Sequence, residues 1–331
     1  MRKQKSILRQ SAALLLALLL LLPGLSSAEG AVTEKDGWHF DAKGFLTGKN
    51  PGKEYLLEDE ENGYWQYASK NLSVKITRVR EQYNKKKIRE YCIAEIWASE
   101  KEPMKSILSA KKGKLPEGAN PVSPALLVQK HPCVFALSDD HYGTRQKSIL
   151  EKSGGVQPGI IIRNGVIRWD KTKARNSKYG RHRPCLDVLA VFNDGSMKTY
   201  ISDEMTAEEY LKKGAVQTFA FGPWLIRDGK INEKEAVEGC GYYEQIEPLV
   251  GLGMIEPYHY IAIVIKGRPK EKYSGARLSW LADRLLELGC VEALNLDGGG
   301  TACMFFNGKS VMQGQANLRS MGGMIAFGLK E

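Results

Sequence analysis

The chain has 331 residues, of which 43% are hydrophobic, so it is long and apolar enough to bury a large core in one main domain. Its formal net charge of +10 is partly due to the N-terminal segment, and the remaining mild excess suits an anionic substrate or an acidic cell wall. The sequence contains no helix-turn-helix, zinc module or aromatic-basic stripe, which argues against a nucleic-acid partner.

The N-terminus, residues 1–28, has the pattern of a secretory signal peptide. Four basic residues within positions 2–9 precede an apolar run at 12–22, and small residues follow at 26–28. We therefore expect cleavage after Ala28 and an exported protein, secreted or associated with the cell envelope. The apolar run is short for a membrane span, which needs roughly 20 residues, so a membrane contact is expected only if this segment stays uncleaved.

Six cysteines in an exported chain allow disulfides, but their pattern does not require them. No pair has the spacing of a zinc site. Cys290 and Cys303 lie in predicted buried strands, where a reduced cysteine acts as a small hydrophobic residue. Both redox states stay open, and no cofactor is predicted.

After the N-terminal segment, residues 29–63 form a polar extension with few regularly spaced apolar residues. The main domain is predicted at residues 64–331, where apolar residues recur at regular spacings. Residues 72–76 and 89–97 alternate as half-exposed strands. Residues 85–87, three lysines, are interpreted as a solvated loop. Residues 103–108 and 123–128 are predicted as helical turns, the second with Ser123 as N-cap and Pro124 in the first position.

Four dipeptides predict hairpins, because Asn-Gly and Asp-Gly accept the positive φ angles that tight turns need. They are Asn164-Gly165, Asp194-Gly195, Asp228-Gly229 and Asn307-Gly308. A capping box at Thr206 predicts a short helix that ends at Lys212. The fold class is therefore α+β, with mixed, largely antiparallel sheets and a few helices.

A strand, a helix and a second strand are predicted between residues 259 and 296. Ser274 is the expected N-cap of the helix and Gly289 the residue just after its end. Such a unit predicts a right-handed crossover between parallel strands. Ligands collect at the carboxyl ends of such strands, where Asp297 falls.

The segment Asn295-Leu296-Asp297-Gly298-Gly299-Gly300-Thr301 is the most informative in the chain. Three glycines cost stability, because glycine loses the most backbone freedom on folding and packs no side chain. They have two readings, a tight turn or an anion-binding loop whose N–H groups converge on a ligand. The apolar flanks, which predict buried strands, favour the loop, and the expected ligand carries a phosphate.

An ordered series of motifs resembles the phosphodiester glycosidase family, and in particular its bacterial members, over roughly residues 64–328. The motifs are 135–143, 162–165, 219–223, 267–268, 295–301 and Arg319. The triple-glycine motif is the most specific of them. The resemblance implies an enzyme that cleaves the C1–O bond of a sugar-1-phosphodiester in a glycan.

The leaving group of this reaction is a stable anion, so a general acid is less necessary than in other glycosidases. A carboxylate and a set of phosphate-binding groups are still needed. Asp297 is the candidate nucleophile or general base. The candidate substrate and phosphate ligands are Gly298, Gly299, Gly300, Thr301, Asn295, Arg268 and Arg319.

Asp140, His141 and Tyr142 form a second constellation. Asp140 and His141 are further catalytic candidates, and Tyr142 and His259 are candidates for substrate binding. A structural histidine is the alternative for His141. The Asp139-Asp140 pair could hold a divalent cation beside a phosphate, although paired acidic residues are also common in turns. Arg163 is interpreted as solvated.

Two departures from the family pattern stand out. Ser138 and Asp139 replace the usual Asn-Gly pair, and Leu249 stands where an arginine is usual. They motivate a second hypothesis, a carbohydrate- or wall-binding protein that kept the fold and lost turnover. A third hypothesis, a structural factor of the envelope, depends only on the predicted export.

Overall fold

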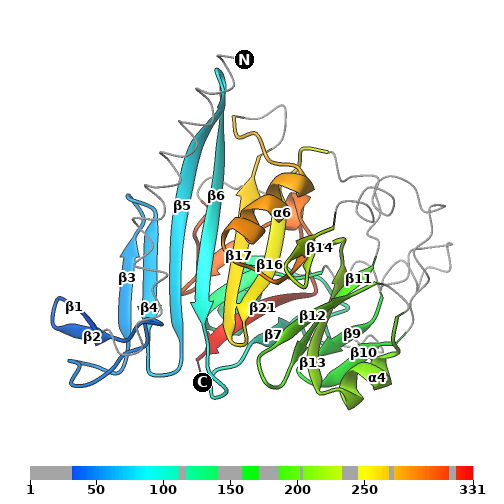
Figure 1. The fold of residues 1–331 in the computed structure, drawn as a ribbon, viewed down its shortest axis with the longest axis horizontal. Coiled ribbons are helices and arrows are strands. Elements are labelled where there is room, and N and C mark those ends of the chain that lie inside the picture. Colours follow the sequence, from blue (N-terminus) through cyan, green and yellow to red (C-terminus); the bar gives the residue numbers. More distant parts are fainter. Residues whose placement is uncertain are drawn as a thin grey trace.

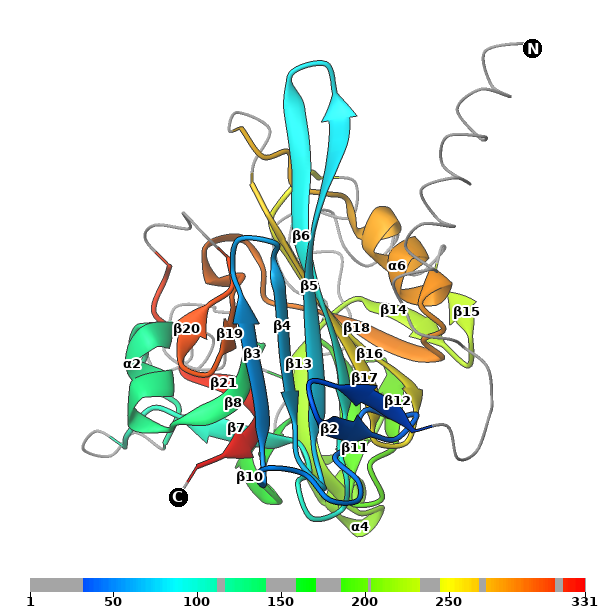
Figure 2. The ribbon, with the colours of Figure 1, turned by 90° about the vertical axis from the view of Figure 1, so that its left-hand side faces the viewer.

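The computed structural model describes residues 32–111, 117–140, 159–170, 186–201, 204–232, 245–267, 272–312 and 318–330. Their strands form three larger sheets and one small hairpin, with few helices (Figures 1 and 2). Every pairing between two of these strands is antiparallel. The predicted α+β class with largely antiparallel sheets is confirmed.

The largest sheet has nine strands in the order β15-β14-β18-β16-β17-β6-β5-β4-β3. In chain order they are β3 (Tyr55–Asp59), β4 (Tyr64–Ala68), β5 (Ser73–Asn84), β6 (Lys87–Trp97), β14 (Trp224–Arg227), β15 (Lys230–Ile231), β16 (Leu249–Glu256), β17 (His259–Lys266) and β18 (Glu292–Leu296). The strands predicted at 72–76 and 89–97 are confirmed as parts of β5 and β6.

Two five-stranded sheets complete the framework. The first, in spatial order, contains β20 (Lys309–Ser310), β19 (Met304–Phe306), β8 (Cys133–Ser138), β21 (Gly323–Leu329) and β7 (Lys105–Leu108). The second contains β10 (Val166–Trp169), β9 (Ile161–Arg163), β13 (Ala215–Phe221), β11 (Asp187–Phe192) and β12 (Met197–Tyr200). The hairpin is β1 (Thr33–Lys35) and β2 (Trp38–Phe40), and the helices are α2 (Pro124–Lys130), α4 (Ala207–Lys212) and α6 (Leu278–Glu287).

The core lies on both faces of the nine-stranded sheet. On one face, residues such as Val264 and Leu294 pack with Phe135 and Phe219 from the two smaller sheets. On the other face, α6 packs its leucines against β16 and β17. A Cβ at Gly251 would lie only 3.0 Å from a methyl of Leu281, so this glycine allows the close approach of the helix.

The strand–helix–strand unit is present but differs from the expected crossover. β17 and β18 both pair antiparallel with β16, which lies between them, so they are parallel to each other without being hydrogen-bonded neighbours. The N-cap of α6 is Arg277, and the Ser274 hydroxyl instead donates to the Gly275 carbonyl. Gly289 follows the helix with φ of +89°, as predicted.

The local turn signals were reliable. All four predicted hairpin turns connect two antiparallel strands, and Asn164, Asp228 and Asn307 take positive φ. The Thr206 capping box is complete, and the helix ends at Lys212. The Ser123 cap of α2 accepts a hydrogen bond from the Leu126 N–H.

The helical turn predicted at 103–108 was wrong. Residues 105–108 form β7, which pairs with β21, and Ile107 is buried against the Met324 side of that strand. Tertiary pairing decided this segment, because a short apolar run fits either structure locally. The predicted division at residue 63 falls in the turn between β3 and β4, so residues 55–59 belong to the nine-stranded sheet.

The predicted signal peptide lies outside the described residues, as do Cys185 and Cys240. Among the residues described, none of the helices combines the length and the apolarity needed to cross a bilayer. The other four cysteines are reduced and buried.

The buried thiols should resist alkylation. Burial raises the pKa of Cys92, Cys133 and Cys303 to about 12, and it also raises the pKa of Cys290. Because the thiolate is the nucleophile, iodoacetamide at pH 8 should leave these four unmodified in the folded protein and modify them in urea. Peptide mapping by mass spectrometry measures this, and a labelled Cys303 in the folded protein would contradict it.

Candidate active site

The ends of two strands from different sheets meet at the candidate site. The Asp297 N–H, just after β18, donates to the Asp139 carbonyl, just after β8, at 3.1 Å. The Ser138 hydroxyl donates to the Thr301 carbonyl at 2.8 Å and accepts from the Cys303 N–H at 2.8 Å. These bonds place the triple-glycine loop beside the Asp139-Asp140 pair.

Asp297 and Arg319 form an ion pair at the edge of this loop. The Arg319 Nη2 lies 3.1 Å from Oδ2 and 3.5 Å from Oδ1 of Asp297. The carboxylate side chain is 8% exposed, whereas the arginine side chain is 52% exposed. The Arg319 backbone N–H also donates to the Gly300 carbonyl at 2.7 Å. A cation open to solvent is thus anchored on the glycine loop beside a sheltered carboxylate.

The three positions of the loop are occupied by glycine for different physical reasons. A Cβ at Gly298 would overlap the Pro248 carbonyl oxygen, and Gly299 has φ of +59° and donates its N–H to that same oxygen at 2.8 Å. At Gly300 the nearest atom to an added Cβ is the Arg319 Cβ, at an ordinary 3.5 Å. Chain packing explains the first two glycines, whereas a methyl group at the third would meet only an ordinary contact beside the ion pair.

The loop itself is a short 3₁₀ turn from Gly299 to Thr301. The tight-turn reading is therefore confirmed, because the Gly299 and Thr301 N–H groups donate to the carbonyls of Pro248 and Gly298. The anion-binding reading stays a prediction. Thr301 is buried, and its hydroxyl donates to the Gly298 carbonyl at 2.7 Å, which stabilises the turn from the protein interior. Its predicted role as a hydroxyl donor to substrate is not supported by this geometry.

Asn295 also has a structural position. It is buried on β18, and its side-chain amide donates to the Gly222 carbonyl at 2.8 Å. Its backbone exchanges further hydrogen bonds with Gly222 and Pro223, so it fixes the segment after β13 beside the site. Asn295 therefore shapes the wall of the site, and its role in binding substrate stays a prediction.

Arg163 is the residue that the sequence interpretation missed. It was interpreted as solvated, but it is fully buried, with its Nη2 2.5 Å from Asp140 Oδ1 and 3.6 Å from Asp139 Oδ2. Its guanidinium also lies 4.6 Å from the centre of the Phe219 ring and donates to the Thr218 carbonyl. Its position just before a hairpin gave no signal of this burial.

Asp140 was predicted as a catalytic residue, and the structure places it in a buried ion pair. It is fully buried, and its second carboxylate oxygen accepts the Ala220 N–H at 2.8 Å. These contacts hold the Asp140 carboxylate in a fixed position, and its catalytic role stays a prediction. Arg163 lies beside both carboxylates of the Asp139-Asp140 pair but offsets the charge of only one of them, so the divalent-cation alternative stays a prediction. The described residues contain no cluster of three or more His, Cys, Asp or Glu side chains that could hold a metal.

His259 was predicted to join the site, and the register contradicts this. His259 is the first residue of β17, where it pairs with Trp97. Asp297 follows Leu296, which pairs with Val250 of β16, and Val250 in turn pairs with Val264 near the last residue of β17. At about 3.3 Å per residue the two ends are about 20 Å apart. His259 stacks on Trp97 and hydrogen-bonds Glu95 at 3.0 Å, which is a structural role.

The two family departures have clear physical consequences. Ser138 uses its hydroxyl to hold the backbone after the glycine loop, so it supports the site. Leu249 is 5% exposed and packs in the cluster that covers α6, so this position brings no charge to the site. Arg268, His141 and Tyr142, three further candidates, lie outside the described residues.

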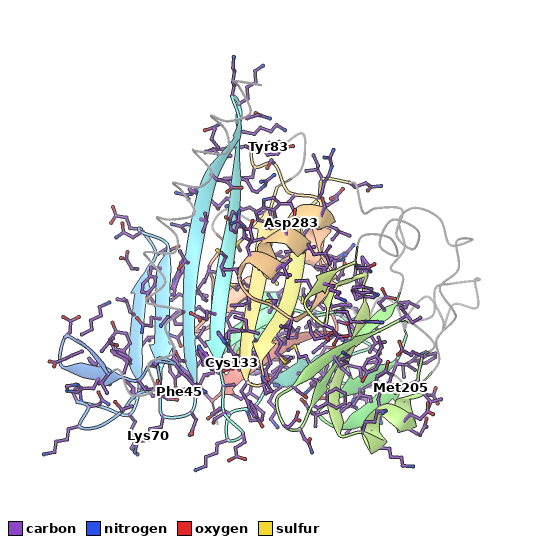
Figure 3. The ribbon with its side chains drawn as sticks, viewed as in Figure 1. Phe45, Lys70, Tyr83, Cys133, Met205 and Asp283 are labelled. Atoms are coloured by element: carbon purple, nitrogen blue, oxygen red, sulfur yellow. The ribbon has the colours of Figure 1, made fainter. Side chains whose placement is uncertain are left out.

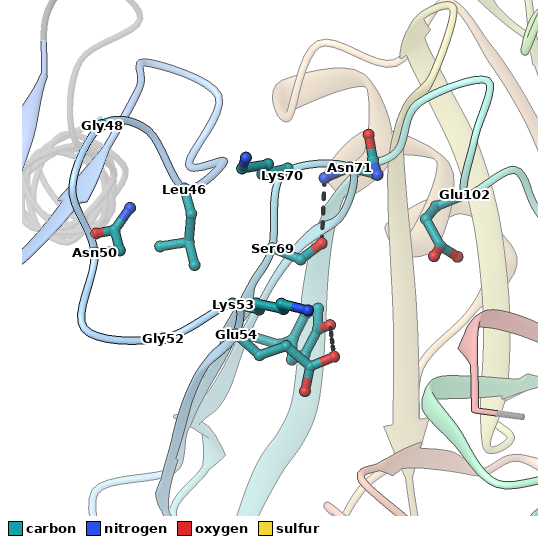
Figure 4. Close-up of a pocket in the computed structure, with 11 residues that line it drawn as sticks. Leu46, Gly48, Asn50, Gly52, Lys53, Glu54, Ser69, Lys70, Asn71 and Glu102 are labelled. Atoms are coloured by element: carbon teal, nitrogen blue, oxygen red, sulfur yellow. Dashed lines mark hydrogen bonds between the residues drawn. The ribbon is translucent and has the colours of Figure 1, made fainter.

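Two hollows lie away from these residues. One, of about 600 Å³, lies between residues 46–54, 69–71 and Glu102 (Figure 4). It lies at the His259 end of the nine-stranded sheet, since Ser73 pairs with Trp97. A second, of about 200 Å³, includes Tyr258 at the same end. Neither hollow includes Asp297 or Arg319.

The fold and the motifs define a known class of protein. The family model for phosphodiester glycosidases matches residues 131–327, more than half of the chain, so the chain belongs to the phosphodiester glycosidase family. A relative in sequence is an uncharacterized SPbeta prophage-derived protein, YomE, of Bacillus subtilis (strain 168), which is 29% identical over 160 residues. That match covers 48% of this chain and only 23% of the relative.

Two solved structures share the fold. One is the catalytic domain of zebrafish N-acetylglucosamine-1-phosphodiester alpha-N-acetylglucosaminidase, auto-inhibited by its pro-peptide, with a TM-score of 0.57 and 15% identity over 85% of this chain and 90% of that one. The other is a hypothetical protein from Synechocystis, with a TM-score of 0.52 and 10% identity over 79% and 63% of the two chains. At these identities the likeness concerns the fold.

The buried Arg163 ion pair should be essential for stability. Arg163→Gln leaves two carboxylates buried without their cation, so the free energy of unfolding should fall by about 3–5 kcal/mol. Urea denaturation measures this. Lys309→Gln is the control, because the Lys309 side chain is exposed and the loss of its ion pair with Glu58 should change stability little. Equal losses in the two variants would contradict the assignment.

Proposed function

We propose that the protein is an exported hydrolase that cleaves the glycosidic C1–O bond of a sugar-1-phosphodiester. The observation that carries this proposal is the Asp297–Arg319 pair at the open side of the glycine loop. A carboxylate and a forked cation 3.1 Å apart suit a substrate whose anomeric carbon is bonded to a phosphate oxygen. Family membership supports the same reaction class.

In this reaction the bond between C1 and the phosphate oxygen breaks, and the electron pair leaves with the phosphate. The leaving phosphomonoester is a stable anion, so the site needs no strong general acid. Asp297 either attacks C1, forming a glycosyl ester that water then hydrolyses, or removes a proton from the attacking water. The water oxygen ends on C1 in both cases.

The departing phosphate is assigned to Arg319 and to the surface beside Gly300. The Arg319 side chain is half-exposed, so it can move from the carboxylate to a phosphate without disturbing the core. Arg268 is added by the family resemblance as a second phosphate ligand. Export is proposed from residues 1–28, and a mature protein whose N-terminus is Glu29 would support it.

A second candidate function is a glycan-binding protein of the same fold without turnover. Leu249 favours it, because the buried leucine leaves the site without the charge that the family usually has there. Saturable binding of a sugar-1-phosphodiester without release of free sugar would support this alternative.

The Asp297 assignment is tested by Asp297→Asn, which keeps the shape of the side chain and removes its charge. Hydrolysis of a sugar 1-(methyl phosphate) diester should fall by about 10²–10⁴-fold. Asp283→Asn is the control, since Asp283 is an exposed carboxylate on α6 (Figure 3). An Asp297→Asn variant as active as the wild type would exclude this role.

The space assigned to the phosphate beside Gly300 gives a separate test. Gly300→Ala should fold with a stability within about 0.5 kcal/mol of wild type, because its methyl meets only an ordinary contact. If a phosphate occupies this space, the same methyl should lower kcat/KM. Gly298→Ala is the comparison variant, and overlap with Pro248 should cost it about 1–3 kcal/mol of stability. Full activity in Gly300→Ala would show that no ligand approaches there.

A further inference from the structure

The β5–β6 hairpin projects beyond the rest of the nine-stranded sheet (Figures 1 and 2). The pairing of β5 with β4 ends at Thr77, and that of β6 with β17 ends at Glu90. Among the described strands, β5 from Arg78 onward therefore pairs only with β6, and β6 before Glu90 pairs only with β5. Outside the strands, Ile88 also forms a single bridge with Tyr273. We call residues 78–90 the ribbon; Tyr83, near its tip, is labelled in Figure 3.

The ribbon is held in place by packing against α6. The Arg89 guanidinium lies 4.8 Å from the ring centre of Tyr83 and 4.7 Å from that of Trp280 on α6. Arg89 also contacts Glu81 across the two strands at 2.8 Å. Because an isolated two-stranded hairpin is only marginally stable in water, these contacts are what give the projecting surface a fixed shape.

The ribbon is strongly basic. It contains six basic and two acidic residues. Both acidic side chains lie away from the turn and are already paired: Glu81 contacts Arg89, and Glu90 contacts Arg80 and Lys266. The turn itself carries residues 85–87, three consecutive lysines, of which the first two are exposed. Positive charge is therefore concentrated at the tip and is not balanced by neighbouring acids of the ribbon.

The ribbon rises from the edge of the sheet that carries the candidate site. Glu90 pairs with Lys266, Ile265 with Leu249, and Val250 with Leu296, so these strand ends lie level with Asp297. With strands about 4.8 Å apart and about 3.3 Å per residue, the lysine turn lies about 25 Å from Asp297. That distance exceeds one sugar phosphate and matches a segment of a polymer.

A crossing segment, residues 272–277, joins the ribbon to the site. The Ser274 N–H donates to the Ile88 carbonyl at 3.0 Å, and the Ala276 N–H donates to the Glu247 carbonyl at 3.1 Å. Next to Glu247, the Pro248 carbonyl accepts the Gly299 N–H of the glycine loop. The segment also carries Lys272 and Arg277, so basic residues continue along the edge toward the loop.

We propose that the ribbon and the crossing segment form a basic track that binds a long anionic glycan, whose repeats are joined by phosphodiesters, and directs it to Asp297. The proposal deepens the proposed function and rests on it for the choice of polymer. A row of cations attracts a polyanion over several repeats, raises its local concentration at the site and makes its binding sensitive to salt.

Lysines on a projecting strand have a second physical explanation, since charges there prevent edge-to-edge aggregation. The two explanations differ in the sign of charge that they require. Glutamates at positions 85–87 would still prevent aggregation, but they would repel a polyanion. A triple Lys85→Glu, Lys86→Glu, Lys87→Glu variant that keeps the oligomeric state of the wild type and loses polymer binding supports the track.

The main experiment compares two triple variants of the full mature chain, each also carrying Asp297→Asn to prevent turnover. One carries glutamine at the ribbon lysines 85, 86 and 87. The control carries glutamine at Lys49, Lys53 and Lys70, exposed lysines at the opposite end of the same sheet (Figure 3 labels Lys70). Fluorescence anisotropy measures the Kd of a labelled poly(glycosyl-1-phosphate) chain at low and high NaCl.

The ribbon variant should bind the polymer about tenfold more weakly at low salt, with little difference at high salt, while the control binds as its parent does. In proteins that keep the wild-type Asp297, kcat/KM for a short sugar 1-(methyl phosphate) diester should be the same with and without the ribbon substitutions. Equal effects of both triple variants on polymer binding, or none, would overturn the proposal. So would binding of a DNA duplex as tight as that of the glycan polymer.

Failure of the two proposals can be told apart. If the protein does not hydrolyse the short diester, the proposed function fails, and the anisotropy measurement still decides whether the ribbon binds the polymer. If the short diester is hydrolysed and the ribbon variant binds the polymer normally, the site stands and the basic track is wrong.

Discussion

The buried ion pair between Arg163 and Asp140 is the interaction on which the site depends. Arg163 ends β9 in one five-stranded sheet, and Asp140 follows β8 in the other. Beside it, the Asp139 carbonyl accepts the Asp297 N–H from the end of β18 in the nine-stranded sheet. Two charges withdrawn from water in this way are costly unless they meet, so the three sheets must dock in one relative position.

Around this contact, some polar residues fix the backbone and others are left to act on a substrate. Ser138, Thr301 and Asn295 direct their polar groups into the backbone and fix where the chain runs. Asp297 and Arg319 are left at the rim, one sheltered and one half-exposed. A reactive carboxylate benefits from such a setting, because the fixed surroundings hold it in position before a substrate arrives.

The sequence predicted the local features well and the long-range ones unevenly. Turn glycines, the Ser123 and Thr206 caps and the alternating strands depend on neighbours in the chain, so they were readable. Residues 105–108 were misassigned because an apolar run of this length suits either a helix or a strand until a partner strand is known. Arg163 and His259 were misplaced for a similar reason, since burial and register belong to the whole sheet.

By itself, the sequence determined the family, the largely antiparallel class and the Asp297 glycine loop, because these depend on residue types at fixed spacings. Only the tertiary structure decided which candidates meet. It joined Asp297 to Arg319, turned Asp140 inward toward Arg163 and moved His259 to the far end of the sheet. The physical reason is that a side chain's partners are set by strand register and sheet docking, which bring together residues that are far apart along the chain.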